Sequence, residues 1–165
     1  MTDPACGVAH GLAAEQPAGR VLVAVFDSPV AGVLLRCSPE LGFRIVLLDP
    51  DPARGAGVLA FDDLPEDLSD ADVVVTDHHR PELGEVLRDA LARPVRWVGV
   101  MGNPRHEGPH VAALAALGVP PEEVARVHRP IGLDIGSRTP AEIALSTLAG
   151  LLADRNGRSG APHGR

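Results

Sequence analysis

The chain has 165 residues, of which 45% are hydrophobic, and a net charge of −7, a size and composition typical of one globular domain. Its basic residues are scattered arginines, which disfavours a general nucleic-acid-binding protein, and no apolar run reaches the roughly 18 residues that a membrane span needs. We therefore expect neither nucleic acid nor a membrane among its partners.

The two ends of the chain are rich in glycine, alanine and proline and show no regular period. We expect residues 1–19 to be a flexible arm and residues 156–165 to be a flexible tail around a single domain, residues 20–155. The beginning of the chain has no basic start and no long apolar segment, so a signal peptide is not expected. Cys6 and Cys37 are interpreted as free thiols of a cytoplasmic protein.

Between the two ends, short apolar runs alternate with helical patterns. Strands are predicted at Arg20–Phe26, Arg44–Leu48, Val58–Phe61, Asp72–Thr76 and Val95–Val100. Helices are predicted at Pro29–Cys37, Pro81–Ala92, Val111–Leu117 and Pro140–Asp154, while the pattern of Glu122–Val127 is ambiguous. Continuously apolar strands that alternate with helices predict an α/β fold, a parallel sheet with helices on both faces.

The last predicted helix has the clearest local signal in the chain. Thr139 is suited to cap it, Pro140 stands at the first helical position, and Glu142 follows three residues after the cap. This is a capping box combined with a favoured proline. Such a start occurs in many proteins, so it indicates structure rather than function.

Ligands of doubly wound sheets collect beyond the carboxyl ends of the strands, which makes each strand-to-helix junction a candidate site. The first junction, Phe26–Gly32, lacks the G-x-G-x-x-G pattern that lets backbone amides approach a pyrophosphate. Asp27 also places a negative charge where a phosphate would lie. Asp49, about 20 residues further on, stands where an acid would bind a ribose. Without the glycines, we interpret Asp49 as a turn residue and disfavour NAD binding.

The second junction brings together an acid and two imidazoles, in Asp77, His78 and His79. These groups could relay protons or bind a metal at the end of a strand. The alternative, which we prefer from the residues alone, is a polar helix start that Asp77 helps to cap.

The third junction contains Gly99, Gly102, Asn103 and Arg105. The glycines let the backbone approach a ligand, the asparagine is a helix cap, and the arginine supplies a charge for a phosphate. A plain tight turn is the alternative. The segment that follows, His106–His110, matches the H-E-x-x-H pattern of zinc proteases. The proline inside it cannot continue the helix that this chemistry requires, so a metalloprotease is disfavoured.

The fourth junction leads into the last helix. Gly132 and Gly136 permit unusual backbone angles. Ser137, Arg138 and Thr139 bring hydroxyls, a guanidinium and free amides to one helix start. We predict an anion cradle here, with a loop that only caps its helix as the alternative.

The order of these motifs resembles one protein family. An apolar strand, T-D-H, W-V-G-V-M-G-N-P-R-H-E and P-I-G-L-D-I-G-S-R-T-P-A-E-I-A-L-S follow one another between Arg20 and Arg155. This order is similar to that of the C-terminal Rossmann-type domain of the XdhC/CoxI family, whose members are accessory factors of molybdenum hydroxylases such as xanthine dehydrogenase and carbon monoxide dehydrogenase. The resemblance implies a Rossmann-like fold, binding of molybdenum cofactor, help in its sulfuration and its delivery to the apo-enzyme.

The resemblance also implies which residues bind the cofactor, a pterin with a phosphate, and it implies no catalytic residue and no structural metal. The expected cofactor-binding residues are Asp77, His78, Gly99, Gly102, Asn103, Arg105, Gly132, Asp134, Gly136, Ser137, Arg138 and Thr139. The expected partner is a molybdenum hydroxylase apo-enzyme. A maturation factor without turnover is favoured over two alternatives, an NAD(P)-binding oxidoreductase-like domain and a non-catalytic docking protein.

The chain departs from the family pattern in several places. Asp27–Pro29 replaces a glycine-rich first turn, Thr76–His78 reads T-D-H in place of T-H-D, and Gly150 stands where an acid is usual. The N-terminal domain of full-length relatives, with its functional cysteine, has no counterpart before Arg20. We therefore expect either a separate partner that carries such a domain or a loss of cofactor binding. Apolar surface left by the missing domain would favour a homodimer, which we also expect.

Overall fold

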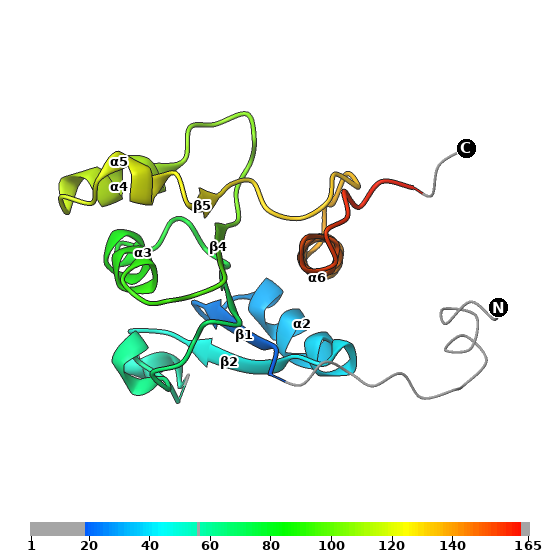
Figure 1. Cartoon of the computed structure of the whole chain (residues 1–165), viewed down its shortest axis with the longest axis horizontal. Coiled ribbons are helices and arrows are strands. Elements are labelled where there is room, and N and C mark those ends of the chain that lie inside the picture. Colours follow the sequence, from blue (N-terminus) through cyan, green and yellow to red (C-terminus); the bar gives the residue numbers. More distant parts are fainter. Residues whose placement is uncertain (1–18, 56, 163–165) are drawn as a thin grey trace.

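Five strands form an all-parallel sheet in the order β2-β1-β3-β4-β5 (Figure 1). They are β1 (Val21–Val25), β2 (Arg44–Leu48), β3 (Ala71–Val75), β4 (Trp97–Val100) and β5 (Val127–His128). The computed structural model describes residues 19–55 and 57–162. The expected flexible arm, apart from Gly19, lies outside the described residues, as does Cys6. Cys37 is an exposed free thiol, as predicted. The parallel α/β fold is confirmed.

The prediction of a strand at Val58–Phe61 is wrong in its length. Only Val58 pairs, as an isolated parallel bridge to Leu48 on the outer side of β2, and the Asp49 amide donates to the Val58 carbonyl (3.0 Å). The chain then turns into a short 3₁₀ helix, η3 (Phe61–Asp63). If the bridge is counted as a residual third strand, the order becomes 3-2-1-4-5-6, which is that of a Rossmann domain.

The helices lie close to their predicted positions. They are α2 (Pro29–Cys37), α3 (Leu83–Leu91), α4 (Pro109–Ala116), α5 (Pro121–Val124) and α6 (Pro140–Arg155), and two further 3₁₀ helices are η1 (Ser38–Leu41) and η2 (Pro52–Arg54). Helix α4 begins before its predicted start because Pro109 takes the first helical position behind Gly108. The ambiguous segment Glu122–Val127 is divided between α5 and β5.

Two cores cover the two faces of the sheet, because successive strand side chains point to opposite sides. Leu22 and Ala24 of β1 pack with α2 and α6, which contact each other on one face (Figure 1). Val21, Val23 and Val25 enter the other core, formed with α3, α4 and η3. Helices therefore cover both faces, as the sequence predicts.

Helix α6 is fastened at both ends. At its start, Thr139 Oγ1 accepts from the Glu142 amide (3.2 Å), and the Glu142 carboxylate accepts from the Thr139 amide (3.1 Å), so the predicted capping box is confirmed. At its end, Arg155 Nε donates to the fully buried carboxylate of Asp72 (2.8 Å). Arg96 Nε donates to the same carboxylate (2.6 Å). Past the helix, the Arg158 amide donates to the Ala153 carbonyl (2.8 Å), and the flexibility of the tail stays a prediction.

The loop before α6 packs directly on the helix through two glycines. Gly132 has φ +89°, and a Cβ atom there would lie 2.7 Å from Ser146 Oγ and 3.1 Å from the backbone of α6. A Cβ at Gly150 would lie 3.2 Å from the Gly132 Cα. The glycine found at position 150 in place of an acid is thus explained by close packing.

The Gly132→Ala variant tests this contact. The left-handed backbone costs an L side chain about 1–2 kcal/mol, and the clash with α6 adds to that cost, so we expect a larger loss of unfolding free energy than strain alone produces. Gly136→Ala is the matched control, because Gly136 also has a positive φ (+68°) but a Cβ atom there would have nothing within 4 Å. Urea denaturation measures both variants, and equal losses would contradict the close-packing explanation.

Candidate functional site at the carboxyl edge of the sheet

A cavity of about 500 Å³ opens between the loop after β3 and the loop after β4. Both loops lie at the carboxyl edge of the sheet, where ligands of this architecture bind. The polar side chains in its wall come from three segments and include three imidazoles, two guanidinium groups and one carboxylate; they are His78, His79, Arg80, Asn103, His106, Glu107 and Arg129. The cavity is therefore lined by groups that suit an anionic or planar polar ligand.

The surroundings of His78 favour the neutral form of its imidazole. Burial, the neighbouring His79 and the Arg129 charge together lower the pKa of His78 below its ordinary value. The rings of His78 and His79 are 4.1 Å apart, centroid to centroid. A neutral imidazole offers one donor and one acceptor, so near pH 7 His78 can hydrogen-bond a ligand without bringing a charge.

Arg129, which the sequence patterns did not single out, organises the loop after β4. Its Nη1 donates to the His106 carbonyl (2.9 Å) and its Nη2 to the Asn103 carbonyl (3.2 Å). A Cβ atom at Gly102 would lie 2.5 Å from the same guanidinium. The glycine at this position therefore leaves room for the Arg129 side chain. The Arg129 Nε is buried without a hydrogen-bond partner. Its only sequence signal is an arginine directly behind a short strand.

The residues predicted at the second and third junctions are brought together, but only some of them face the cavity. His78 and Asn103 line it. Asp77 instead accepts from the amide of His79 (2.9 Å) within its own loop. The Asn103 carboxamide accepts from the Arg105 amide (2.9 Å), which closes a tight turn. That turn leaves the Arg105 side chain exposed and outside the cavity wall.

Gly99, also predicted to bind a ligand, lies inside β4. A Cβ atom there would lie 2.5 Å from the Ile131 side chain and would overlap the Trp97 ring. The chain's own side chains therefore fill the space beside this glycine. Its role in cofactor binding stays a prediction, and packing explains why the residue is small.

The fourth junction does not line the cavity. The amides of Arg138 and Thr139 donate to the Glu142 carboxylate (2.6 and 3.1 Å), and Ser137 Oγ donates to the Glu142 carbonyl (3.2 Å). These amides lower the pKa of Glu142. The predicted anion cradle thus holds the chain's own carboxylate. Cofactor binding by this segment, which includes Gly132, Asp134 and Gly136, stays a prediction.

The histidines of the H-E-x-x-H match do not share a helix face. His106 lies in the loop, since α4 begins only at Pro109, and His110 is buried with its ring against Gly108. In the described part of the chain, no group of three His, Cys, Asp or Glu side chains could hold a metal ion. This geometry does not support zinc-protease chemistry.

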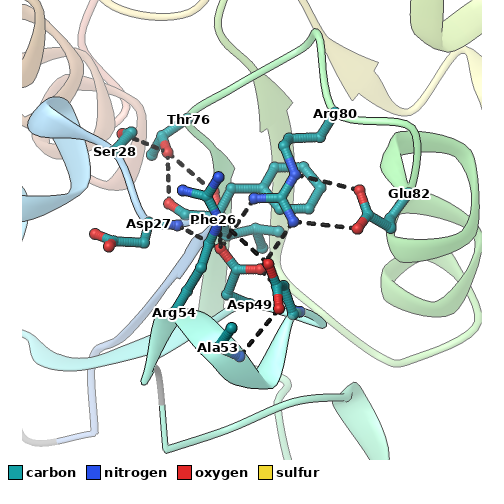
Figure 2. A network of polar contacts seen from close by, with 11 residues as sticks. Phe26, Asp27, Ser28, Asp49, Ala53, Arg54, Thr76, Arg80 and Glu82 are labelled. Atoms are coloured by element: carbon teal, nitrogen blue, oxygen red, sulfur yellow. Dashed lines mark hydrogen bonds and ion pairs between the residues drawn. The ribbon is translucent and has the colours of Figure 1, made fainter.

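The first junction forms a separate polar network (Figure 2). The Asp27 amide donates to the Asp49 carboxylate (2.8 Å), and both Arg80 Nη atoms donate to it (3.2 and 3.0 Å). Burial alone would raise the pKa of Asp49, but these hydrogen bonds and the Arg80 charge outweigh it, so the pKa lies below its ordinary value. Ser28 Oγ accepts from the Ala31 amide (3.1 Å) and caps α2.

Comparison with known proteins places the fold in a family. The family model described as the XdhC Rossmann domain matches residues 22–151. The uncharacterized protein YqeB of Escherichia coli K12 is 32% identical over 136 residues, which are 82% of this chain and 24% of YqeB. Glutamyl-tRNA reductase 2 of a Nocardioides species is 38% identical over 89 residues, 50% of this chain and 20% of that protein.

A solved structure shows the same fold. The crystal structure described as a xanthine dehydrogenase from Bacillus halodurans superposes with a TM-score of 0.65 at 24% identity, covering 84% of this chain and 45% of that chain. The chain thus spans less than half of the solved relative and about a quarter or less of the curated relatives. Among the described residues, no helix is long and apolar enough to cross a membrane.

We expect Arg129→Ala to loosen the loop after β4 without unfolding the domain. Hydrogen bonds from charged groups contribute about 1.5–3 kcal/mol each at most, so the unfolding free energy should fall by a few kcal/mol and the loop amides should exchange faster. Arg105→Ala, which removes an exposed arginine from the same loop, should change stability by less than about 0.5 kcal/mol. Equal effects in denaturation and hydrogen exchange would refute the organising role.

Stability should fall as the pH drops below about 6.5, the ordinary histidine value. Burial and the Arg129 charge lower the pKa of His110, whose residue is only 7% exposed. Below that pH the unfolded chain binds the proton more readily than the folded one, so each such histidine destabilises the fold by up to about 1.4 kcal/mol per pH unit. The loss stops once the pH passes below the folded pKa.

Urea midpoints measured between neutral pH and about pH 5 test this behaviour. His110→Gln should flatten the decline, whereas His106→Gln, at an exposed position of the loop, should leave the slope unchanged. A slope that is the same in wild type and His110→Gln would show that another group causes the decline.

Proposed function

Because the chain belongs to the XdhC Rossmann-domain family, we propose that it is an accessory factor that binds molybdenum cofactor and assists its maturation or its insertion into a molybdenum hydroxylase. The family is linked to the maturation of xanthine dehydrogenase. The solved relative from Bacillus halodurans, described as a xanthine dehydrogenase, supports the same client class.

The cavity between the loops after β3 and β4 carries this proposal. Molybdenum cofactor combines a planar pterin with a phosphate, and the wall supplies groups for both. The imidazoles of His78 and His79 offer flat faces and ring donors, the Asn103 carboxamide offers a donor and an acceptor, and Arg129 supplies positive charge. The buried Arg129 Nε, which has no partner, is a donor that a bound anion would satisfy.

The role that fits this wall is binding and orientation. When bound, the cofactor supplies the molybdenum centre and its redox chemistry, which belong to the hydroxylase that receives it. The side chains of this chain hold the pterin and phosphate, exclude water from the buried side and release the group to the client. An oxidoreductase role would require a dinucleotide at the first turn, where the amides and Asp49 are already hydrogen-bonded within the chain.

The proposed partners follow from the family. We propose that the chain works with the hydroxylase apo-enzyme and with the N-terminal domain of its family. A homodimer is part of the same proposal. A protein that only docks to the hydroxylase would bind the apo-enzyme but not the cofactor.

Co-elution of molybdenum cofactor with the pure chain, followed by pterin fluorescence, tests the function. We expect retention, and we expect His79→Ala, which removes an imidazole from the wall, to weaken it about tenfold, a difference of about 1.4 kcal/mol. Arg138→Ala removes a charge outside the cavity wall, at the other cofactor-binding position predicted from the sequence, and it should retain the cofactor if the cavity is the site.

Loss of retention in Arg138→Ala alone would move the site to the start of α6. If the wild type retains no molybdenum cofactor, whether alone or with the partner domain, the proposal is wrong. Binding to the apo-hydroxylase without any cofactor would favour the docking role instead.

A further inference from the structure

We propose that the dinucleotide crevice of this Rossmann domain is closed by the chain itself, with the Arg80 guanidinium in the space where a nucleotide ribose would meet Asp49. The crevice lies at the ends of β1 and β2, beside the cavity described above, and Arg80 forms part of both. The consequence is that NAD, NADP and other dinucleotides do not bind at this turn.

The turn keeps the shape of a dinucleotide turn but not its residues. In the G-x-G-x-x-G/A pattern, the first glycine follows the first strand, and the other positions lie two and five residues later. Phe26, Ser28 and Ala31 occupy these positions here. Phe26 has φ +70°, the left-handed conformation that favours glycine, although its side chain is fully buried. The backbone therefore bends like that of a binding turn around a large side chain.

Three of the amides that could hold a pyrophosphate at this turn are used within the chain. Asp27 donates its amide to Asp49 (2.8 Å), and Ala31 donates its amide to the Ser28 hydroxyl (3.1 Å). Pro29, at the first helical position, has no N–H. The Gly32 amide donates to the Ser28 carbonyl within the helix (3.0 Å). A phosphate at this helix start would have to displace these bonds and would also meet the charge of Asp27.

The acid that would bind the ribose has no free acceptor site. A carboxylate offers about four lone-pair sites, and Asp49 accepts four hydrogen bonds. Two come from the amides of Asp27 and Asp51 (2.8 and 3.0 Å) and two from Arg80 (3.2 and 3.0 Å). The Arg54 Nε also lies 3.9 Å from this carboxylate. Because the Asp49 side chain is fully buried, a ribose hydroxyl could reach it only by replacing one of these donors, and Arg80 takes two of the four acceptor sites.

Arg80 is held in the crevice from three sides (Figure 2). Asp49 lies below the guanidinium, Glu82 accepts from its Nε and Nη2 (3.2 and 3.1 Å), and the Phe26 ring centroid is 4.7 Å from its Cζ atom. The two carboxylates and the aromatic ring together provide hydrogen bonds, ion pairs and a cation–π contact for the planar Arg80 guanidinium. The side chain is only 12% exposed. Displacing it would leave two carboxylates without their shared partner.

The experiment compares three folded proteins by titration with NAD⁺, followed through backbone amide and arginine Nε–H signals. In the wild type, the amides of residues 26–32 and the Arg80 Nε–H should not move at millimolar NAD⁺. The opened variant Asp27→Asn/Ser28→Gly/Arg80→Ala frees the Ala31 amide and Asp49, and it should bind NAD⁺. The matched control Asp27→Asn/Ser28→Gly retains Arg80 and should bind at least about tenfold more weakly than the opened variant.

Three results would overturn the proposal. One is saturable movement of the first-turn signals in the wild type. The second is equal affinity of the control and the opened variant, which would show that Arg80 does not close the crevice. The third is a folded opened variant that binds no NAD⁺. If the opened variant does not fold, the Arg80 Nε–H signal of the wild type tests the proposal by itself. Displacement of Arg80 by NAD⁺ must shift that signal, and a shift would overturn the proposal. None of these measurements involves the molybdenum cofactor.

Discussion

The buried carboxylate of Asp49 joins three segments at the carboxyl edge of the sheet. It follows β2, yet it accepts from the turn after β1, from its own turn, and from Arg80 in the loop after β3. Removing one partner of such a buried pair costs about 3–5 kcal/mol, because the other charge is left unpaired. The loop that presents His78 and His79 is therefore anchored across the end of β1.

A second arginine plays a comparable part on the other side of the cavity. Arg129 follows β5 and donates to two carbonyls of the loop after β4, and Gly102 leaves room for its guanidinium. Each wall of the cavity thus depends on an arginine from a different segment. These contacts hold the polar groups of the cavity in place, an arrangement suited to binding a polar ligand.

The fold has kept the Rossmann frame while two of its anion-binding positions hold the chain's own groups. At the first turn, Arg80 and Asp49 satisfy each other, and at the start of α6 the Glu142 carboxylate takes the free amides. In the cavity wall, by contrast, the buried Arg129 Nε has no hydrogen-bond partner among the described residues. This contrast distinguishes the cavity from the two positions that the chain's own groups occupy.

The elements whose signals are local could be predicted from the sequence. Helix α2, strand β2 and the capping box of α6 lie where predicted, because apolar runs, caps and prolines act on near neighbours in the chain. The missing glycines of the first turn could also be read directly. Three features appear only in the folded chain: Val58 forms a single bridge, Arg80 pairs with Asp49, and Arg129 organises a distant loop. Those outcomes depend on contacts between residues far apart in the chain, and a pattern of neighbours does not contain them.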